Sequence, residues 1–460
     1  MKILLINAID PYAGVEGRYP PLGLGYLAAS LRKHFGPDYF QFKIVDRDIE
    51  NEIAGFAPDL VGITSVTQNY NRAKNYAKMA KARGIPVIMG GIHISMLPGS
   101  LSRDMTVGVI GEAEGTIVDL LKLFTQEKRL APERLSDIAG IVYWAGGQPA
   151  LTQKRQPITP LDEIPFPARD LLAVGRNTYI FTSRGCPYRC VFCASSRYWD
   201  KVRFFSAEYV VSEIDDLVDK YKVEVINFYD DLMIADKERL KKIVKLLKAR
   251  PYSGRVRFTA NARANVLTAE TVGLLKEMNV FSVGMGLESG CRRSLKYLKG
   301  GSVTVEDNLK AIRLLKQHKI SPNASFVIGS PDETEAEILE TLDFIKKSGL
   351  DIADTYVLTP FPGTPVWEEA KGRGLVSDDM DWERLSVSFY EKHDKAIILS
   401  KTISRERLYQ LFLRFKRLNT YLVIKKVFHH PSLMLSGLRR VVNMIKGLGK
   451  NENIVLKSAV

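Results

Sequence analysis

The segment NTYIFTSRGCPYRCVFC, residues 177–193, contains a short apolar strand that leads into a loop with three cysteines. These are Cys186, Cys190 and Cys193, and their spacing is C-x3-C-x2-C. Thiolates placed this closely on a loop interrupted by Gly and Pro can converge on one metal centre. Structural zinc usually takes its ligands from two separated Cys or His pairs, and the sequence contains no second pair. An iron–sulfur cube accepts a compact cysteine run, and three ligands for four irons leave one iron open.

A series of strands and helices continues from this loop. Together with the first strand, the later strands make six strand–helix units, which predict an open (β/α)6 barrel, a partial form of the eight-fold barrel. In such barrels the chemistry lies at the C-terminal ends of the strands, which is where the cysteine loop begins. The later strands are expected within VEVINFYDD (223–231), RVRFTANAR (255–263), FSVGMGLES (281–289), NASFVIGS (323–330) and DTYVLTPFP (354–362).

Residues 1 to about 125 alternate between strand and helix in the same way. This alternation predicts a doubly wound parallel sheet that binds ligands at the C-terminal ends of its strands. Its strands are expected within KILLINA (2–8), FQFKIVD (40–46), DLVGITSV (59–66), IPVIMGG (85–91) and VGVIGEAE (107–114).

The length of 460 residues exceeds that of one ordinary domain. Between the two α/β series, a hairpin is expected to turn at Gly146-Gly147, before a Pro-rich linker. The predicted organisation is a doubly wound domain (1–135), a hairpin and linker (136–175), a barrel (176–375) and a basic helical region (376–460).

The net charge of +14 is concentrated at one end of the chain. Residues 401–460 contain 13 Lys and Arg but only 2 acidic residues, and therefore carry +11 of the total. The predicted helices 405–428 and 431–449 place apolar residues at helical spacing opposite Lys and Arg. Such helices either lie on an anionic membrane, which would suit a lipid-like substrate, or pack their apolar faces on the barrel and leave the charges in water.

The composition also indicates the cellular compartment in which the protein is expected. Four cysteines, three of them clustered, argue against a disulfide framework and for a reducing environment. The N-terminal residues MKILLINAID run directly into a strand without the layout of a signal peptide. No apolar run reaches the roughly 18–20 residues that span a bilayer. We therefore expect a cytoplasmic protein, with peripheral membrane contact as the alternative for its basic end.

The cysteine pattern, with Phe192 before the last cysteine, resembles the signature of the radical S-adenosylmethionine (SAM) superfamily. The resemblance implies a 4Fe–4S cluster on Cys186, Cys190 and Cys193, whose open iron chelates SAM. An electron from a flavodoxin or ferredoxin then splits SAM to a 5′-deoxyadenosyl radical. A structural zinc site and a plain electron-transfer cluster are the alternatives.

The resemblance also implies SAM contacts near the first two strand ends of the barrel. Phe192 is expected to pack near the adenine, unless it is a core aromatic residue. Tyr229 and Asp230 end the second strand, where the family binds the SAM amino group largely through backbone carbonyls. Asp230 could instead cap the helix that follows.

Further SAM contacts are implied at the later strand ends. Arg263 would pair with the SAM carboxylate or with a neighbouring acid. Glu288, assisted by Ser289, would accept hydrogen bonds from the ribose hydroxyls or the ammonium group. Gly329 would pack its backbone against adenine. Cys291, which follows the Glu-Ser-Gly turn, is expected to be a small buried residue.

The first domain resembles the cobalamin-binding domain that is fused to many radical SAM enzymes. The resemblance rests on residues 20–31, on Gly90-Gly91 and on residues 111–116, GEAEGT. It implies that Ser65 and the paired glycines let the nucleotide tail of cobalamin lie against the sheet. A domain that kept this fold and lost the cofactor is the alternative.

The histidine that ligates cobalt in one branch of these domains belongs to an Asp-x-His-x-x-Gly motif, and this motif is absent after the first strand. His93 is the one histidine near a strand end. We expect His93 to be a loop or helix-start residue rather than a cobalt ligand.

Together the motifs resemble the cobalamin-binding radical SAM enzymes, which include methyltransferases and an anaerobic porphyrin-cyclase-like group. The resemblance implies a Rossmann-like cobalamin-binding domain, a radical SAM barrel and methylation of an unactivated carbon in a small-molecule or lipid-like substrate. Cyclisation, oxidation or carbon–carbon coupling, with or without cobalamin, is the alternative outcome. No nucleic-acid partner is expected, because the basic residues lie on amphipathic helices and not in an aromatic groove.

Overall fold

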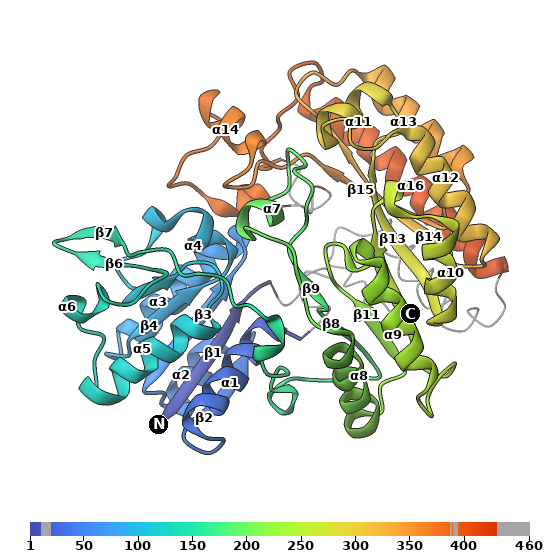
Figure 1. The fold of residues 1–460 in the computed structure, drawn as a ribbon. Coiled ribbons are helices and arrows are strands. Elements are labelled where there is room, and N and C mark those ends of the chain that lie inside the picture. Colours follow the sequence, from blue (N-terminus) through green and yellow to red (C-terminus); the bar gives the residue numbers. More distant parts are fainter. Residues whose placement is uncertain (11–19, 387–388, 390–393, 430–460) are drawn as a thin grey trace. The chain divides into compact units, whose positions relative to one another are not determined.

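The computed structural model describes residues 1–10, 20–386, 389 and 394–429, and these form two compact units. Each unit is built on its own mainly parallel sheet (Figure 1). The first unit contains the described residues of 1–174, 197–200 and 371–385, and the second contains those of 175–196, 201–370 and 386–460.

The sheet of the first unit has the strand order β2-β1-β3-β4-β5-β6-β7. β1 to β5 are parallel, and the hairpin β6–β7 adds two antiparallel strands at one edge. The strands of a parallel sheet covered on both faces are apolar along most of their length, as β1 is. Their bounds are β1 (Lys2–Ala8), β2 (Gln41–Val45), β3 (Leu60–Ser65), β4 (Val87–Gly90), β5 (Val107–Val109), β6 (Ile141–Ala145) and β7 (Gln148–Leu151).

The strand order of this sheet reverses between β1 and β3, where Ala8 pairs with Ser65. Open sheets of this kind bind ligands beyond the carboxyl ends of the strands at such a reversal. The helices that connect the strands are α1 (Leu22–Phe35), α2 (Ile49–Phe56), α3 (Tyr70–Lys81), α4 (Ile92–Met96), α5 (Glu114–Glu127) and α6 (Pro132–Leu135).

The Pro-rich linker packs on the first unit. Its Ala168 N–H donates to the Gly25 carbonyl of α1 at 3.0 Å, and a Cβ at Gly25 would lie 3.2 Å from Pro167. The Asp170 carboxylate pairs with Arg32 of the same helix at 2.8 Å. A glycine on α1 is therefore needed for the linker to approach this closely.

Residues 371–385 also belong to the first unit, although they follow the barrel in the chain. Their contact is made by Trp382, whose ring is 1% exposed and lies 4.5 Å from the His93 ring and 6.3 Å from the Tyr70 ring. The sequence analysis placed these residues at the junction of the barrel and the basic region. Local hydrophobic pattern shows that a segment is buried but not which unit buries it.

The second unit contains a six-stranded parallel sheet in the order β15-β14-β13-β12-β11-β8. β15 and β8 lie at opposite edges of this order, so the barrel is open. The strands are β8 (Asn177–Ile180), β11 (Val225–Phe228), β12 (Arg257–Ala262), β13 (Val280–Glu288), β14 (Ser321–Ile328) and β15 (Ile352–Val357).

Three helices of this unit, α10 (Ala269–Glu277), α12 (Val305–Gln317) and α13 (Glu335–Ser348), begin at a capping box. Thr268, Thr304 and Thr334 each form a capping box with the side chain three residues later. The helices are α8 (Ala207–Tyr221), α9 (Lys237–Lys248), α10 (Ala269–Glu277), α11 (Arg292–Lys299), α12 (Val305–Gln317), α13 (Glu335–Ser348) and α14 (Pro365–Gly372).

The sequence predictions of fold class are confirmed for both units. The first sheet has the predicted doubly wound arrangement, and the second has the predicted six parallel strands. The predicted hairpin turn is also present, since Gly146 and Gly147 join β6 to β7 with φ of +54° and +85°.

The basic helix α16 (Arg405–His429) packs against the edge strand β15. Its buried side chains include Leu408, Phe412 and Phe415. Asn419 completes the edge: its Oδ1 accepts from the Ala353 N–H at 2.9 Å, and its Nδ2 donates to Asp354 Oδ1 at 3.0 Å. One apolar face of the helix therefore covers the barrel. For this segment, this is the arrangement predicted as the alternative to lying on a membrane.

The second predicted basic helix, residues 431–449, and the last residues of the chain lie outside the described residues. No helix in the described ranges is both long and apolar enough to cross a membrane.

We predict that Asn419→Ala destabilises the protein by about 1–3 kcal/mol, because the edge N–H of Ala353 loses its acceptor in a buried position. Urea unfolding would measure the change. Gln410→Ala is the matched control, since the exposed Gln410 side chain donates to Glu406 on the same helix and has no other partner among the described residues. Equal stability of the two variants would contradict the edge role of Asn419.

Candidate functional site

The cysteine loop is closed at its base by two short strands. β9 (Ser183–Arg184) pairs antiparallel with β10 (Arg203–Phe204), and the Phe205 N–H donates to the Thr182 carbonyl at 3.1 Å. Gly185 starts the loop with φ of +95°, a conformation that favours glycine. The pairing of β9 with β10 therefore holds the two ends of the loop together.

The middle of the loop is held at Val191. Its N–H donates to the Leu298 carbonyl of α11 at 3.1 Å, and its carbonyl accepts from the Val366 N–H of α14 at 3.4 Å. The Cys193 N–H donates to the Cys190 carbonyl at 3.2 Å. Backbone bonds from two separate helices thus fix the turn that carries the second and third cysteines.

None of these three cysteines forms a disulfide, and all three are partly exposed. Burial raises the pKa of Cys186 and raises that of Cys193 to about 11. A metal centre must therefore displace their protons, which couples metal binding to pH. Within the described residues no three His, Cys, Asp or Glu side chains converge on a single-ion position. A cube does not require that, because each cysteine ligates a different iron, so the three cysteines fit a 4Fe–4S cluster.

The predicted site residues lie at the carboxyl ends of neighbouring strands. Asp230 follows β11, Arg263 follows β12, Glu288 ends β13 and Gly329 follows β14. Because the strands are parallel, these ends meet at one edge of the sheet, the edge at which the cysteine loop begins after β8.

Arg263 lies against the cysteine loop. Its Nη1 donates to Cys190 Sγ at 3.4 Å, and its guanidinium stacks 3.8 Å from the Tyr188 ring centre. Its Nη2 donates to the Ser302 hydroxyl, while its buried Nε has no partner among the described residues. The structure thus places a fixed positive charge beside a predicted cluster ligand, Cys190, and the expected SAM carboxylate contact stays a prediction.

Glu288 is almost completely buried and has a buried cation beside it. The Lys299 Nζ lies 3.5 Å from Glu288 Oε1 and also donates to the Gly286 carbonyl. Burial raises the pKa of Glu288, while the charges of Lys299 and then Arg263 oppose the rise. The Glu288 carboxylate packs against Gly286, and a side chain at Gly286 would collide with it, because a Cβ there would lie only 2.3 Å from Oε1. Glu288 itself has φ of +64°, a strained conformation for a residue with a side chain.

Asp230 binds the start of the cysteine loop. Its Oδ1 accepts from the Thr182 N–H at 2.7 Å and from the Ser183 hydroxyl at 2.6 Å. Burial raises the pKa of Asp230 to about 6, against the effects of Ser183 and Arg239. It caps no helix here, because Asp236 is the N-cap of α9.

Tyr229 precedes Asp230 and is 48% exposed. Its ring lies 5.3 Å from the Tyr179 ring and 6.1 Å from the Phe181 ring. Phe192 is also partly exposed on the cysteine loop. Both residues have the accessibility that a SAM contact requires, and their assignment stays a prediction.

Ser289 is used within the protein. Its hydroxyl lies 2.8 Å from the Thr341 hydroxyl and accepts from the Cys291 N–H at 3.1 Å. Cys291 is 5% exposed, as expected for a small buried residue. The predicted SAM contact of Ser289 would have to coexist with these bonds.

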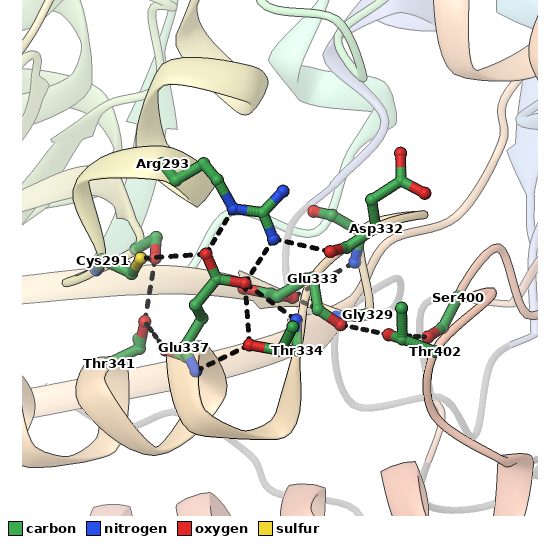
Figure 2. A network of polar contacts seen from close by, with 12 residues as sticks. Cys291, Arg293, Gly329, Asp332, Glu333, Thr334, Glu337, Thr341, Ser400 and Thr402 are labelled. Carbon is green, nitrogen blue, oxygen red and sulfur yellow. Dashed lines mark hydrogen bonds and ion pairs between the residues drawn. The ribbon is translucent and has the colours of Figure 1, made fainter.

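Gly329 begins the loop between β14 and α13 with φ of +82°. Its N–H donates to Glu333 Oε2 at 2.8 Å, within the network of polar contacts in Figure 2. A Cβ at this position would lie 3.0 Å from Leu408 of α16. The turn out of β14 therefore requires glycine for both conformation and space.

Several buried polar atoms at this edge of the second sheet lack a hydrogen-bond partner among the described residues. A polar ligand bound at this edge would give these atoms partners, although buried polar atoms elsewhere in the described chain also lack them. SAM, with its amino, carboxylate and ribose groups, fits this requirement. The atoms are Thr182 Oγ1, Asp230 Oδ2, Arg263 Nε and Ser330 Oγ.

In the first unit, Ser65 lies at the end of β3, beside the reversal of strand order. It is 4% exposed, and its hydroxyl has no partner among the described residues. Gly91 packs against it, since a Cβ there would lie 2.6 Å from the Ser65 carbonyl oxygen, whereas Gly90 has nothing closer than 4.0 Å. An unpartnered hydroxyl and an open backbone at Gly90 fit a polar ligand such as the cobalamin tail, while Gly91 is required by the protein itself.

His93 is the second residue of α4 and is fully buried. Its ring stacks 3.9 Å from the Tyr70 ring, and its Nε2 lies 3.1 Å from the Ser100 hydroxyl. Burial lowers the pKa of His93 to about 3. The residue is a neutral core histidine at a helix start.

The sequence analysis missed three polar residues that support the site: Lys299, Glu333 and Thr402. Lys299 and Glu333 lie on or beside surface helices whose Lys and Glu are mostly solvated, so nothing in the pattern distinguished them. Thr402 lies 69 residues after its partner Glu333.

Two family models match the chain. One, described as the radical SAM superfamily, matches residues 180–345, and the other, described as a B12 binding domain, matches residues 12–121. An uncharacterized methyltransferase of Pyrococcus horikoshii is 32% identical over 96% of this chain and 98% of its own length. The anaerobic magnesium-protoporphyrin IX monomethyl ester cyclase of Cereibacter sphaeroides is 24% identical over 94% of this chain and 72% of its own. The bacteriochlorophyllide d C-12(1)-methyltransferase of Chlorobaculum tepidum is 27% identical over 86% and 82%.

Solved structures share the fold. The radical SAM methyltransferase TsrM from Kitasatospora setae, with cobalamin and a [4Fe-4S] cluster bound, has a TM-score of 0.66 at 19% identity, over 81% of this chain and 78% of its own. The cobalamin-dependent SAM radical enzyme OxsB, with aqua-cobalamin and SAM bound, has a TM-score of 0.65 at 19% identity, over 90% and 61%.

We predict that Lys299→Met weakens binding of S-adenosylhomocysteine near neutral pH. Loss of the cation raises the pKa of Glu288 further, so the carboxyl takes up a proton, and affinity should recover as the pH rises through the new pKa. For each pKa unit by which the pKa of Glu288 rises in the variant, affinity falls by up to about tenfold at pH values below that pKa. Anaerobic calorimetry from pH 6 to 9 would test this, with exposed Lys296→Met on the same helix as control. A pH-independent loss would contradict the electrostatic role.

Proposed function

The chain belongs to the cobalamin-binding radical SAM enzymes, and from this premise we propose that it methylates an unactivated carbon of a small molecule. The single observation that carries the proposal is the fixed cysteine loop at a strand edge where Arg263, Glu288 and the Gly329 loop also lie. Methyltransferases among the relatives support methyl transfer as the outcome.

The cofactors would be held by residues of both units. We infer that Cys186, Cys190 and Cys193 hold the 4Fe–4S cluster, and that Ser65 and Gly90 contact cobalamin. When bound, the cluster supplies the electron that cleaves SAM, and cobalamin carries the methyl group. The protein's share is to bind, orient and exclude water.

The charged residues of the site have distinct tasks in this proposal. Burial raises the pKa of Glu288, and Lys299 and Arg263 oppose this rise, so the two cations favour the carboxylate form that can accept hydrogen bonds from SAM. Arg263 offers its unpartnered Nε toward the SAM carboxylate. Asp230 keeps the first residues of the cysteine loop in place through Thr182 and Ser183.

Cyclisation of a porphyrin-like substrate is a second candidate outcome. It is favoured by the 24% identity to the cyclase over 94% of this chain. Product analysis separates the two, because only a methyltransferase moves the methyl group of SAM to the substrate.

We predict that anaerobic reconstitution with iron, sulfide and hydroxocobalamin loads about four irons and one cobalt per chain. The Cys186→Ala, Cys190→Ala, Cys193→Ala triple variant should lose the iron and keep the cobalt, because the two sites use different residues. Cys291→Ala is the matched control and should retain both metals. Zinc in place of iron would overturn the radical SAM assignment. If iron and cobalt load as predicted, methyl-labelled SAM would show whether the active protein transfers the methyl group.

We also propose an electron donor and a membrane contact. A flavodoxin or ferredoxin would reduce the cluster. The far end of α16 exposes Tyr421 and Phe428 at 59% and 69%, near Lys425. Aromatic residues among lysines suit the surface of an anionic membrane, so we include peripheral membrane contact in the proposal.

We expect the wild-type protein to co-sediment with vesicles that contain anionic lipid, and Tyr421→Ser with Phe428→Ser to reduce the bound fraction several-fold. Neutral vesicles are the control for charge. Sedimentation that is independent of anionic lipid would remove the membrane contact from the proposal.

A further inference from the structure

The loop from Gly329 to Thr334, between β14 and α13, is held from within by a buried carboxylate. Glu333 is 2% exposed, and its Oε2 accepts from the Gly329 N–H at 2.8 Å and from the Ser330 N–H at 3.2 Å. Two backbone donors on one carboxylate are charge-assisted bonds in a place that excludes water. These two bonds hold the end of the loop, at Glu333, against its beginning, at Gly329 and Ser330.

A segment from beyond the barrel, Ser400–Thr402, runs along the same loop (Figure 2). The Lys401 N–H donates to the Pro331 carbonyl at 2.7 Å, and the Thr402 hydroxyl donates to the Glu333 carbonyl. The Lys401 side chain adds ion pairs with Asp332 at 3.4 Å and with Glu369 of α14 at 3.3 Å. The segment thus bonds to three consecutive residues of the loop.

The other side of the loop is bounded by helices. Arg293 of α11 donates to both carboxylate oxygens of Glu337 and to the Asp332 carbonyl. Glu337 in turn completes the capping box of Thr334 at the start of α13. Arg293 holds the pKa of Glu337 at about 2, so this ion pair persists over the whole physiological range.

The fixed loop leaves two buried side-chain oxygens, Ser330 Oγ and Glu333 Oε1, without a hydrogen-bond partner among the described residues. The Ser330 side chain lies in a residue that is 4% exposed, and its hydroxyl has no partner in the part of the chain that the structure describes. A loop that is tied on every side, yet keeps an unpaired buried hydroxyl, is arranged for a ligand rather than for its own stability.

We propose that Ser400–Thr402 positions the Gly329 loop for the adenosine part of SAM, with Glu333 and Thr402 as the positioning residues. The proposal rests on the proposed function only in taking the Gly329 loop as part of the SAM site. In consequence the region after the barrel sets the affinity for SAM although no residue of Ser400–Thr402 needs to touch it. A purely structural tether for α16 would instead change stability and leave SAM affinity unaltered.

The test uses variants that remove single bonds. Thr402→Val removes the hydroxyl that donates to the Glu333 carbonyl, and Glu333→Gln removes the charge that holds two N–H groups. Thr420→Val, which removes a hydroxyl bond within α16, and Glu335→Gln, at an exposed ion pair with Arg407, are the matched controls. Thr402→Ser keeps the hydroxyl and should rescue Thr402→Val.

Binding of S-adenosylhomocysteine to the cluster-loaded, full-length protein would be measured by anaerobic calorimetry. We expect the Kd to rise about threefold to tenfold for Thr402→Val and about tenfold or more for Glu333→Gln. The KM for SAM in formation of 5′-deoxyadenosine should rise in parallel, while kcat at saturating SAM stays within about twofold of the wild type. The melting temperature of each variant is recorded alongside.

An unchanged Kd with a lowered melting temperature would overturn the proposal, and so would control variants that shift the Kd as much. If Glu333→Gln does not fold, Thr402→Val and its Ser rescue decide the question alone. Wild-type protein that binds S-adenosylhomocysteine but transfers no methyl group would refute methyl transfer without touching this inference. The two failures are therefore distinguishable.

Discussion

The cysteine loop has little secondary structure of its own, so its shape depends on backbone hydrogen bonds supplied by other elements. The ladder between β9 and β10 closes its base, and Val191 is bonded to α11 on one side and α14 on the other. The two bonds of Val191 join parts of the chain that are more than a hundred residues apart. The proposed cluster site is therefore formed only when the barrel is formed, and the strand edge around it also depends on the folded barrel.

Electrostatic balance at that edge follows from burial. Glu288, Lys299 and Arg263 are all buried, and an isolated charge among them would cost several kcal/mol. Two cations beside one carboxylate give this group of three side chains a net positive charge, and its Arg263 guanidinium donates to Cys190. That charge suits a cluster with anionic ligands and a cosubstrate with a carboxylate. The site therefore has an electrostatic reason for its composition that is independent of its likeness to other proteins.

Much of this arrangement could be predicted from the sequence. The strands, the open barrel, the hairpin and the cysteine loop follow from local signals: apolar runs, glycines and the spacing of three cysteines. What could not be predicted are partnerships across long separations, such as Trp382 with His93, Lys299 with Glu288 and Thr402 with Glu333. Periodicity tells which face of an element is buried, but not what buries it. Ser289 illustrates the same limit, because its position at a strand end did not reveal that Thr341 takes its hydroxyl.

The discontinuous make-up of both units has a consequence for synthesis. The first unit includes Trp382, which packs on His93, so an N-terminal domain that emerges first must wait for more than half of the chain before its core is complete. The edge of the second sheet likewise waits for Asn419, well after β15 has been made. Neither unit can finish folding during translation until these later residues have left the ribosome. Until then the nascent chain carries incomplete surfaces, and these are the surfaces that chaperones recognise.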